Sequence, residues 1–275
     1  MDENSQQTCA RVAPFLKWAG GKRWLVDKYD ELFIPFSGKF FEPFLGSGAV
    51  FFGVSPARSI LSDQNAELIN CYKQIRNHWS DVELGLRKQH SLHNKDHYYL
   101  VRSSEPTDNL ERAIRFLYLN RTCWNGLYRV NHKGQFNVPI GTKSNVVLDT
   151  DNFEAVSKIL KRASLKVSDF EKTINLAGDE DFVFVDPPYT VKHNVNGFIK
   201  YNQRLFSWDD QLRLRNAIEG AVSRGAKVLV TNAAHQSIID LYDGLGEMMT
   251  LNRRSVISGL SKGRGSFDEL VIKCF

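Results

Sequence analysis

The sequence has no run of eighteen apolar residues, and its few cysteines show no ligand spacing. A helix that crosses a bilayer needs about twenty apolar residues, so we expect no membrane segment. The polar, acidic residues 1–15 lack the apolar core of a signal peptide. Cys9, Cys71, Cys123 and Cys274 lie far apart, which argues against a zinc site and favours a reducing compartment. We therefore expect a cytoplasmic protein with no metal requirement.

Acidic residues are missing from three long stretches, although the net charge is only +5. Any one stretch would be explained by scattered, solvated charge, but three of them flank the motifs described below. Basic segments of this kind can form one positive face that meets phosphate groups, and we favour a polyanionic partner. The basic residues are Arg112, Arg115, Arg121, Arg129, Lys133 and Lys143 in 112–148, Lys192, Lys200 and Arg204 in 187–208, and Arg253, Arg254, Lys262 and Arg264 in 248–266.

Short apolar runs alternate with segments of helical periodicity over much of the chain. Ser207 with Asp210 resembles a capping box in front of a helix that Gly225 closes. Another helix is expected from Ala49. The alternation predicts an open α/β sheet with helices on both faces. The expected strands are 39–44, 57–63, 164–168, 181–186, 227–231 and 268–274.

Residues 66–150 break this rhythm. The segment 109–120 has the apolar spacing of a helix, and 127–139 consists of two extended runs around Lys133 and Gly134, which predicts a β-hairpin. We expect a mostly helical unit that ends in a basic hairpin. This unit, residues 66–150, is inserted into the α/β domain, which is built from residues 1–65 and 151–275.

Two glycine-containing segments point to a cofactor site. Gly46-Ser47-Gly48 lies between a strand and a helix, where a ligand can approach the backbone, although an ordinary turn is the commoner cause. A nicotinamide cofactor is disfavoured because Phe51 replaces the third glycine of the dinucleotide motif. Asp63 ends the next strand and either binds ribose hydroxyls or caps a helix.

The segment 15–23 is not a phosphate-binding loop of the Walker type, and its Lys22 can neutralise a ligand carboxylate. S-adenosylmethionine has a carboxylate and no phosphate, so it fits this set of groups. Asp169 and Phe170 follow an extended run. In one interpretation Asp169 accepts a hydrogen bond from the adenine amino group of the cofactor, and Phe170 packs on the adenine ring. In the other, Asp169 is an ordinary loop acid and Phe170 an ordinary core aromatic.

The sharpest motif is Asp186-Pro187-Pro188-Tyr189, directly after a buried strand. The amino nitrogen of adenine is a poor nucleophile because its lone pair is delocalised into the ring. A carboxylate and a main-chain carbonyl that accept both amino protons would localise that lone pair. Residues before proline are held extended, so the acceptors of Asp186 and Pro187 would be preorganised. Tyr189 offers a face on which a base flipped out of the duplex can stack.

Together, the glycine motif, the residues 66–150 and the motif 186–189 resemble the corresponding parts of the Dam/DpnII-type DNA adenine-N6 methyltransferases. The shared segments are 15–22, 41–51, 62–69, 116–121, 125–129, 134–141, 181–189 and 267–271, in the family's order of glycine motif, recognition domain and catalytic motif. The resemblance implies a Rossmann-like methyltransferase sheet with an inserted DNA-recognition domain. It implies S-adenosylmethionine contacts at Trp18, Lys22, Phe44, Gly46, Gly48, Asp63, Asp169, Phe170 and Asp186, and catalysis by Asp186, Pro187, Pro188 and Tyr189.

The resemblance also implies DNA contacts at Lys17 and in the hairpin, at Leu127, Arg129 and Pro139. We add Arg121, Trp124 and Asn125 as further candidates for DNA contact. Arg129 can pair bidentately with guanine, and Leu127 and Pro139 can touch thymine methyl groups, so the expected target is GATC. The chain departs from the family at two positions. Trp124 stands where an intercalating tyrosine is usual, and Lys143 replaces a tyrosine, which favours a phosphate contact there.

Other interpretations of the sequence remain open. One is a methyltransferase that acts on cytosine N4 or on a protein glutamine, because both substrates present a planar amine, as adenine does. Another is a DNA-binding regulator on an inactive methyltransferase fold, which the intact catalytic motif disfavours. As partners we expect double-stranded DNA and, in a restriction–modification system, a cognate endonuclease. The expected state is a monomer or a weak dimer.

Overall fold

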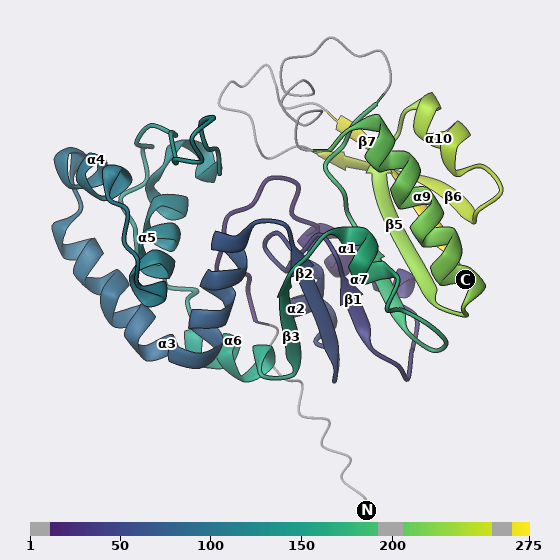
Figure 1. The fold of residues 1–275 in the computed structure, drawn as a ribbon, viewed down its shortest axis with the longest axis horizontal. Helices are drawn as coiled ribbons and strands as arrows, with labels where there is room; N and C mark the ends of the chain where they lie inside the picture. The colour runs from purple at the N-terminus through teal and green to yellow at the C-terminus, as the bar shows by residue number, and fades with distance from the viewer. Residues whose placement is uncertain (1–11, 192–205, 255–265) are drawn as a thin grey trace, which may run out of the picture.

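The computed structural model describes residues 12–191, 206–254 and 266–275, which build a sheet and a helical lobe beside it (Figure 1). The sheet has 7 strands in the order β3-β2-β1-β4-β5-β7-β6. Its first five strands are parallel, whereas β7 runs antiparallel to β5 and β6. The strands are β1 (Phe40–Glu42), β2 (Ser59–Asp63), β3 (Ala163–Val167), β4 (Phe182–Val185), β5 (Lys227–Ala233), β6 (Glu247–Arg254) and β7 (Ser266–Cys274).

Helices cover both faces of the sheet, because its central strands are apolar on both sides. All four residues of β4 are buried, as expected for a parallel strand between two layers. Phe40 belongs to one core and Phe41 to the other. The first core includes residues of α1 (Arg23–Lys28), α2 (Ala49–Val54), α3 (Ala66–Leu92) and α6 (Phe153–Leu160), and the second includes residues of α7 (Phe170–Ile174), α9 (Trp208–Ser223) and α10 (Gln236–Tyr242).

Local signals set the helix starts. The predicted capping box before α9 is present, with Ser207 and Asp210 bonded reciprocally. The Asn65 side chain caps α3 by accepting hydrogen bonds from the main-chain N–H groups of Glu67 and Leu68.

The strand order and the two cores confirm the predicted α/β architecture with helices on both faces.

The helical lobe consists of the second part of α3 together with α4 (Lys95–Ser103) and α5 (Asn109–Thr122). A non-helical residue, His78, interrupts α3. Before this kink, Leu68 and Tyr72 lie in the same core as Phe40 and Leu61 of the sheet. The predicted helix 109–120 is confirmed as α5. After the kink, Val82 and Leu86 belong to the same core, so one hydrophobic core continues from the sheet into the helical lobe.

The segment 127–139 reverses direction as predicted, but less regularly than a two-stranded hairpin. Asn137 donates to the Arg129 carbonyl, and Asn131 to the Gln135 carbonyl, through main-chain bonds of 3.1 and 2.8 Å. Between them Val130 and Phe136 form an isolated bridge. In the described part of the chain these residues form no longer ladder. Arg129 and Lys133 are exposed in this segment, whereas Phe136 and Val138 are buried.

Candidate active site

The glycine turn and the catalytic motif follow two adjacent parallel strands. β1 pairs with β4, and the order of the sheet reverses between them because β2 and β3 lie on one side and β5 on the other. Ligands of open α/β sheets bind outside the carboxyl ends of the strands at such a reversal. Gly46 follows β1 and Asp186 follows β4, so the fold brings both predicted motifs to this edge.

The glycine turn is held by contacts that leave no room for side chains. Gly46 and Gly48 have positive φ angles of 47° and 62°. A Cβ atom on Gly46 would lie 2.7 Å from Cδ1 of Trp18. Tyr72 donates from its hydroxyl to the Gly46 carbonyl at 3.0 Å. The predicted cofactor residue Trp18 therefore lies directly on the turn.

Asp63 supports the same turn from the end of β2. Its Oδ2 accepts the Gly46 N–H at 3.2 Å and its Oδ1 accepts the Asn65 N–H at 2.9 Å. Burial raises the pKa of Asp63, although these backbone donors oppose the rise. Because each carboxylate oxygen has more than one lone pair, the contacts are compatible with a further ribose hydroxyl. The helix cap proper is Asn65 rather than Asp63.

At the centre of the site lies a buried cationic side chain between two carboxylates. Lys22 is 3% exposed, and its Nζ lies 2.9 Å from Oδ1 of Asp186 and 2.9 Å from Oε1 of Glu269. Its third contact is the Gly20 carbonyl at 2.8 Å. An ammonium has three N–H donors, so these three acceptors match its full capacity. The sequence expected Lys22 to meet a ligand carboxylate, whereas here it meets two carboxylates of the protein.

Two groups from different parts of the chain orient Asp186. Besides Lys22, the Thr231 hydroxyl on β5 donates to its Oδ1 at 2.9 Å. Among the described residues these contacts fall on Oδ1, which leaves Oδ2 as an acceptor. Tyr189 donates its hydroxyl to Glu269, and the Lys22 ammonium lies 5.0 Å from the centre of the Tyr189 ring. Burial raises the pKa of Asp186, and the ammonium of Lys22 opposes that rise.

A third acid, Glu42, is buried beside this cluster at the end of β1. Its Oε2 accepts the Phe51 N–H at 3.1 Å. Burial raises the pKa of Glu42 well above its usual range, and the Asp186 charge adds to the rise. The uncharged form of Glu42 is therefore favoured in the folded protein.

This burial predicts that Glu42→Gln stabilises the fold as the pH rises. In wild type the unfolded chain releases the Glu42 proton above its ordinary pKa of 4.5, while the folded chain retains it. Between those two pKa values, stability falls by about 1.4 kcal/mol per pH unit. Urea unfolding from pH 4 upward should show a growing advantage for the variant. A difference that is constant with pH would contradict the burial of an uncharged Glu42.

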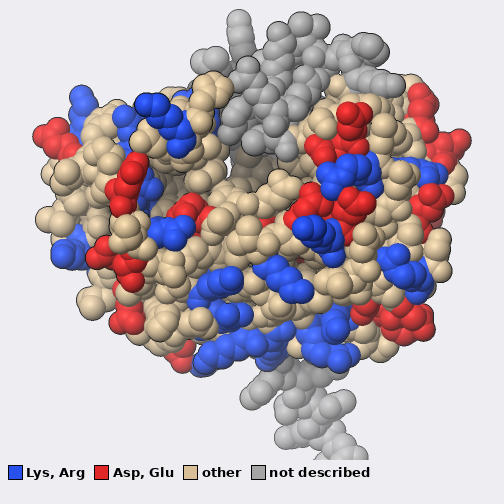
Figure 2. Space-filling view, in the orientation of Figure 1, with Lys and Arg blue, Asp and Glu red and all other residues tan. Residues whose placement is uncertain are grey.

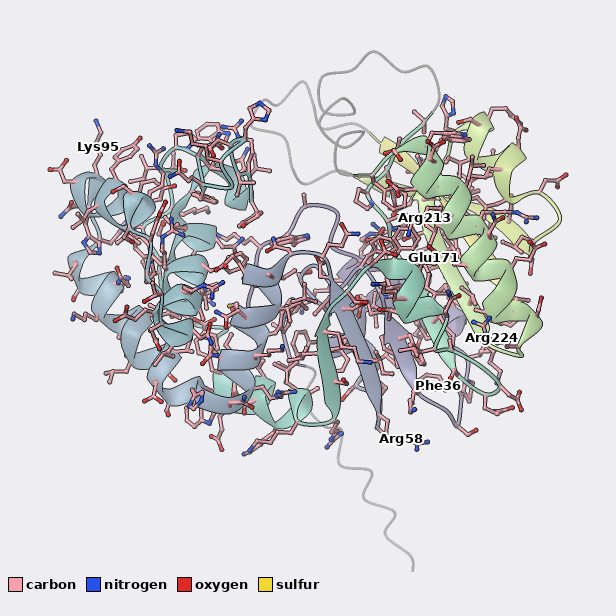
Figure 3. The ribbon with its side chains drawn as sticks, viewed as in Figure 1. Phe36, Arg58, Lys95, Glu171, Arg213 and Arg224 are labelled. Carbon is pink, nitrogen blue, oxygen red and sulfur yellow. The ribbon has the colours of Figure 1, made fainter. Side chains whose placement is uncertain are left out.

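The other predicted cofactor residues lie where α7 and α9 meet the sheet. Phe44 and Phe170 stack at 5.4 Å with an interplanar angle of 22°. Asp169 caps α7 and accepts hydrogen bonds from Gln64 at 3.0 Å and from Arg213 at 3.0 Å. Arg213 also bonds Glu171, and Figure 3 labels the two residues close together. Phe170 is buried against Phe44, so its predicted contact with the cofactor ring stays a prediction.

Lys17 connects the N-terminal segment 15–22, called the N-terminal strap below, to the helical lobe. Asn120 on α5 accepts the Lys17 N–H at 2.9 Å and donates to the Lys17 carbonyl at 2.7 Å. The next residue, Trp18, stacks on Tyr128 with ring centres 5.9 Å apart. Tyr128 is thus half-buried rather than freely exposed. One short strap contacts both the glycine turn and the segment predicted to read DNA.

Most of the predicted DNA-contacting side chains lie at the surface around this strap. Trp124 is 48% exposed. Its main-chain N–H donates to the Pro139 carbonyl at 2.9 Å, which brings the two backbones together. Asn125 has a positive φ of 55°. Asn125, Arg129 and Pro139 are exposed, and Leu127 is half-buried.

The prediction of a DNA contact by Arg121 is wrong for this structure. Its side chain is 0% exposed and binds both oxygens of Asp151 at 2.6 Å. It also donates to the carbonyls of Val146 and Phe15 at 2.7 and 3.0 Å. These bonds join α5 to the N-terminal strap and to the segment before α6. The basic composition of its surroundings misled the sequence argument, because arginine also serves as a buried donor.

Among the described residues, some of the basic side chains predicted to form the positive face bind other groups of the protein. Arg112 is paired with Glu67, and Arg115 donates to the carbonyls of Val101 and Arg102. Arg129, Lys133 and Lys143 remain exposed. Figure 2 shows a depression between the lobes beside the residues drawn in grey. Lys192, Lys200, Arg204, Lys262 and Arg264, and the side chains of Arg253 and Arg254, lie outside the described residues.

Sequence reasoning missed two polar residues of the site. Glu269 is 5% exposed on β7, and Thr231 is fully buried in β5, two residues before that strand ends. A buried acid within an apolar strand was the available signal for Glu269, and a polar residue at the end of the expected strand 227–231 was the signal for Thr231. Both need the strand order before they can be assigned.

No group of three or more metal-ligating side chains occurs among the residues that the structure describes. Within the same part of the chain, no helix combines the length and apolarity needed to cross a bilayer.

The strand order, the glycine turn and the acid after β4 define a methyltransferase of the Rossmann-like class. The chain belongs to the family of D12 class N6 adenine-specific DNA methyltransferases, whose model matches residues 18–257. It is thus an enzyme, a site-specific adenine DNA methyltransferase.

Curated relatives align over nearly the whole chain. The Type II methyltransferase M1.LlaDCHI of Lactococcus lactis subsp. cremoris is 36% identical, over 97% of this chain and 97% of the relative. The Type II methyltransferase M.MjaIII of Methanocaldococcus jannaschii is 34% identical, over 95% of this chain and 98% of its own. The DNA adenine methylase of Vibrio cholerae serotype O1 is 30% identical, over 94% of both chains.

Proposed function

We propose that this enzyme transfers the methyl group of S-adenosylmethionine to N6 of an adenine flipped out of duplex DNA. The observation that carries the proposal is the position of Asp186, 2.9 Å from Lys22 and one strand away from the glycine turn. The glycine turn with Trp18 and Asp63 would hold the cofactor. When bound, the cofactor supplies a methyl group on a positively charged sulfonium.

Asp186 and the Pro187 carbonyl act on the amine of the substrate. Asp186 Oδ2 accepts one amino proton and the Pro187 carbonyl the other, which localises the nitrogen lone pair for direct displacement. Lys22 and Thr231 hold the opposite oxygen of Asp186 at 2.9 Å each, so this acceptor is oriented before the substrate arrives. A proton leaves the nitrogen after transfer, so Asp186 does not need to act as a general base.

The target base must leave the helix to reach this site, at a cost of about a few kcal/mol. We propose that Trp124 fills the resulting gap, because it is a large aromatic residue that is 48% exposed. Tyr189 offers the stacking face. Residues 66–150 are proposed as the recognition domain.

GATC is the proposed target. Arg129 would bond guanine, Leu127 and Pro139 would touch thymine methyl groups, and Lys17 would contact a further base. Lys143 would contact phosphate. The exposure of Arg129 and Pro139 supports this assignment. In this structure Arg129 bonds the Asn137 side chain at 2.8 Å, and it must exchange that bond for guanine.

Methylation of a plasmid tests this proposal directly. Plasmid DNA without prior adenine methylation is incubated with the enzyme and S-adenosylmethionine, then digested with GATC-specific nucleases that cut only methylated or only unmethylated sites. We expect the GATC sites to resist the nuclease that cuts unmethylated sites and to be cut by the nuclease that requires methylation, and we expect N6-methyladenine in the hydrolysed nucleosides. Arg129→Ala should spread methylation to other sequences, because one bidentate contact contributes about 1–3 kcal/mol of discrimination. Methylation at a different sequence would refute the target, and N4-methylcytosine would favour the alternative chemistry.

The relatives named Type II methyltransferases support a cognate restriction endonuclease as a partner. A cytoplasmic location and a monomer or weak dimer stay predictions. If the intact wild-type protein does not bind S-adenosylmethionine, the result would instead favour a DNA-binding regulator.

A further inference from the structure

Asn120 is a buried amide near the end of α5 that belongs to none of the predicted sites. It is 2% exposed. Its Oδ1 accepts the Lys17 N–H at 2.9 Å, and its Nδ2 donates to the Lys17 carbonyl at 2.7 Å and to the Gly126 carbonyl at 3.4 Å. One side chain thus binds both main-chain groups of the strap residue that is predicted to contact DNA.

The contacts of Asn120 require an amide. A main-chain N–H can only donate and a main-chain carbonyl can only accept, so the two bonds to Lys17 fix the orientation of the amide. Aspartate has no N–H donor and leucine has no polar side-chain atom, so neither can form both bonds. Asparagine is among the weaker helix formers, and helix propensity therefore does not explain its presence in α5.

The end of α5 holds the strap at two further points. The Arg121 side chain, which is bound to Asp151, donates to the Phe15 carbonyl at 3.0 Å. The Arg121 carbonyl accepts a hydrogen bond from Lys17 Nζ at 3.2 Å. Two consecutive residues of one helix therefore hold the strap at residues 15 and 17, and they bind both the main chain and the ammonium of Lys17.

The turn in front of the segment proposed to read DNA packs against the same strap residue. Gly126 has a positive φ of 65°, and a Cβ atom there would lie 2.8 Å from Cβ of Lys17. Leu127 and Arg129, two of the side chains proposed to contact bases, follow this turn in the sequence. Residues that select a ligand must be held to within about 0.5 Å of their productive positions. The bonds of Asn120 thus set the place of Lys17 relative to the other residues proposed to contact bases.

We propose that Asn120 is a specificity-determining residue that acts through Lys17. It holds the Lys17 main chain where the ammonium can reach one base pair of the target. The proposal rests on the function proposed above, in which Lys17 and Arg129 contact different bases. Asn120 itself is a positioning residue, because its amide binds only groups of the protein. Without its bonds the strap can shift on the turn, and discrimination weakens at the base pair that Lys17 contacts.

Initial rates of methyl transfer to a series of duplexes provide the test. Each duplex carries either GATC or one substituted base pair outside the target adenine, and the other strand is already methylated so that one adenine is available. The full-length wild type is compared with Lys17→Ala, Asn120→Asp, Asn120→Leu and the double variant Lys17→Ala/Asn120→Leu. The discrimination at a base pair is the ratio of two rates from one preparation, so it does not depend on the folded fraction.

Two variants serve as controls. Asn175→Asp makes the same chemical change at an exposed residue outside 66–150. Arg129→Ala removes a different proposed base contact, so it should weaken discrimination at a different base pair. Thermal melting identifies the variants that fold, and either replacement of Asn120 serves the purpose, because each removes a bond to Lys17.

We expect Lys17→Ala to lower discrimination at one base pair about tenfold, within the range for one good base contact. Asn120→Asp and Asn120→Leu should weaken discrimination at the same base pair. The double variant should discriminate no worse than Lys17→Ala alone, since residues that act through one contact are not additive. Asn175→Asp should match wild type.

A purely structural role for Asn120 would lower the rate on all duplexes by the same factor, and that result would overturn the inference. It would also be overturned by additive losses in the double variant, or by unchanged discrimination in Lys17→Ala or in the Asn120 variants. If wild type does not methylate GATC, the proposed target is refuted instead. The same series is then built on the sequence that the plasmid experiment identifies, and the same outcomes decide the role of Asn120.

Discussion

Asp186→Asn is expected to lower the rate of methyl transfer by about 10²–10³-fold, the usual cost of removing one preorganised polar group from a transition state. The amide has one acceptor oxygen and one N–H donor group. It cannot keep both its bonds from Lys22 and Thr231 and an acceptor for the adenine amine. Single-turnover transfer of labelled methyl groups to a duplex measures the effect.

Asp243→Asn is the control, because Asp243 is exposed, lies outside residues 66–150, and undergoes the same change of charge. Duplex retention in a gel-shift assay should stay near wild type in both variants, since Asp186 lies outside the segment proposed to read DNA. A rate for Asp186→Asn within threefold of wild type would exclude Asp186 as the acceptor.

Arg121→Ala is expected to lower the free energy of unfolding by about 3–5 kcal/mol, the range for breaking a buried ion pair from one side. The change leaves the Asp151 carboxylate without its bidentate partner and the carbonyls of Phe15 and Val146 without a donor. Urea unfolding followed by far-ultraviolet circular dichroism measures the loss.

Arg129→Ala provides the contrast, because Arg129 is an exposed arginine of the same basic stretch. Its effect on stability should stay within about 0.5 kcal/mol, as for most surface substitutions, and its effect should fall on sequence selection. Equal stability of the two variants would contradict a structural role for Arg121.

The sheet could be predicted from the sequence because its strands have strong local signals. The apolar run of β4 and the capping box of α9 identify their elements without tertiary information. β6 was missed, because its sequence, Glu247–Arg254, is polar at both ends and it pairs only at the edge of the sheet. The irregular reversal at 127–139 was predicted in direction, but its single bridge depends on contacts such as Tyr128 with Phe136.

The site could be predicted motif by motif, but not its charge pairing. Gly46 and Asp186 each follow a strand that can be predicted from the sequence, and the parallel pairing of β1 with β4 brings them to the same edge of the sheet. The pairing of Lys22 with Glu269 joins residues from opposite ends of the chain, and no local pattern specifies it. Arg121 failed for the opposite reason: composition places it in a basic stretch, whereas burial assigns it to Asp151.

The central claim is that Asp186, oriented by Lys22 and Thr231, accepts the amino group of an extruded adenine. A crystal structure of the enzyme with a non-reactive cofactor analogue and a GATC duplex tests it most directly. We predict the target adenine outside the helix on the Tyr189 ring, with its amino nitrogen within hydrogen-bond distance of Asp186 Oδ2 and the Pro187 carbonyl. A target adenine that remains stacked in the duplex, or an amine bound elsewhere while Asp186 faces only Lys22, would contradict the claim.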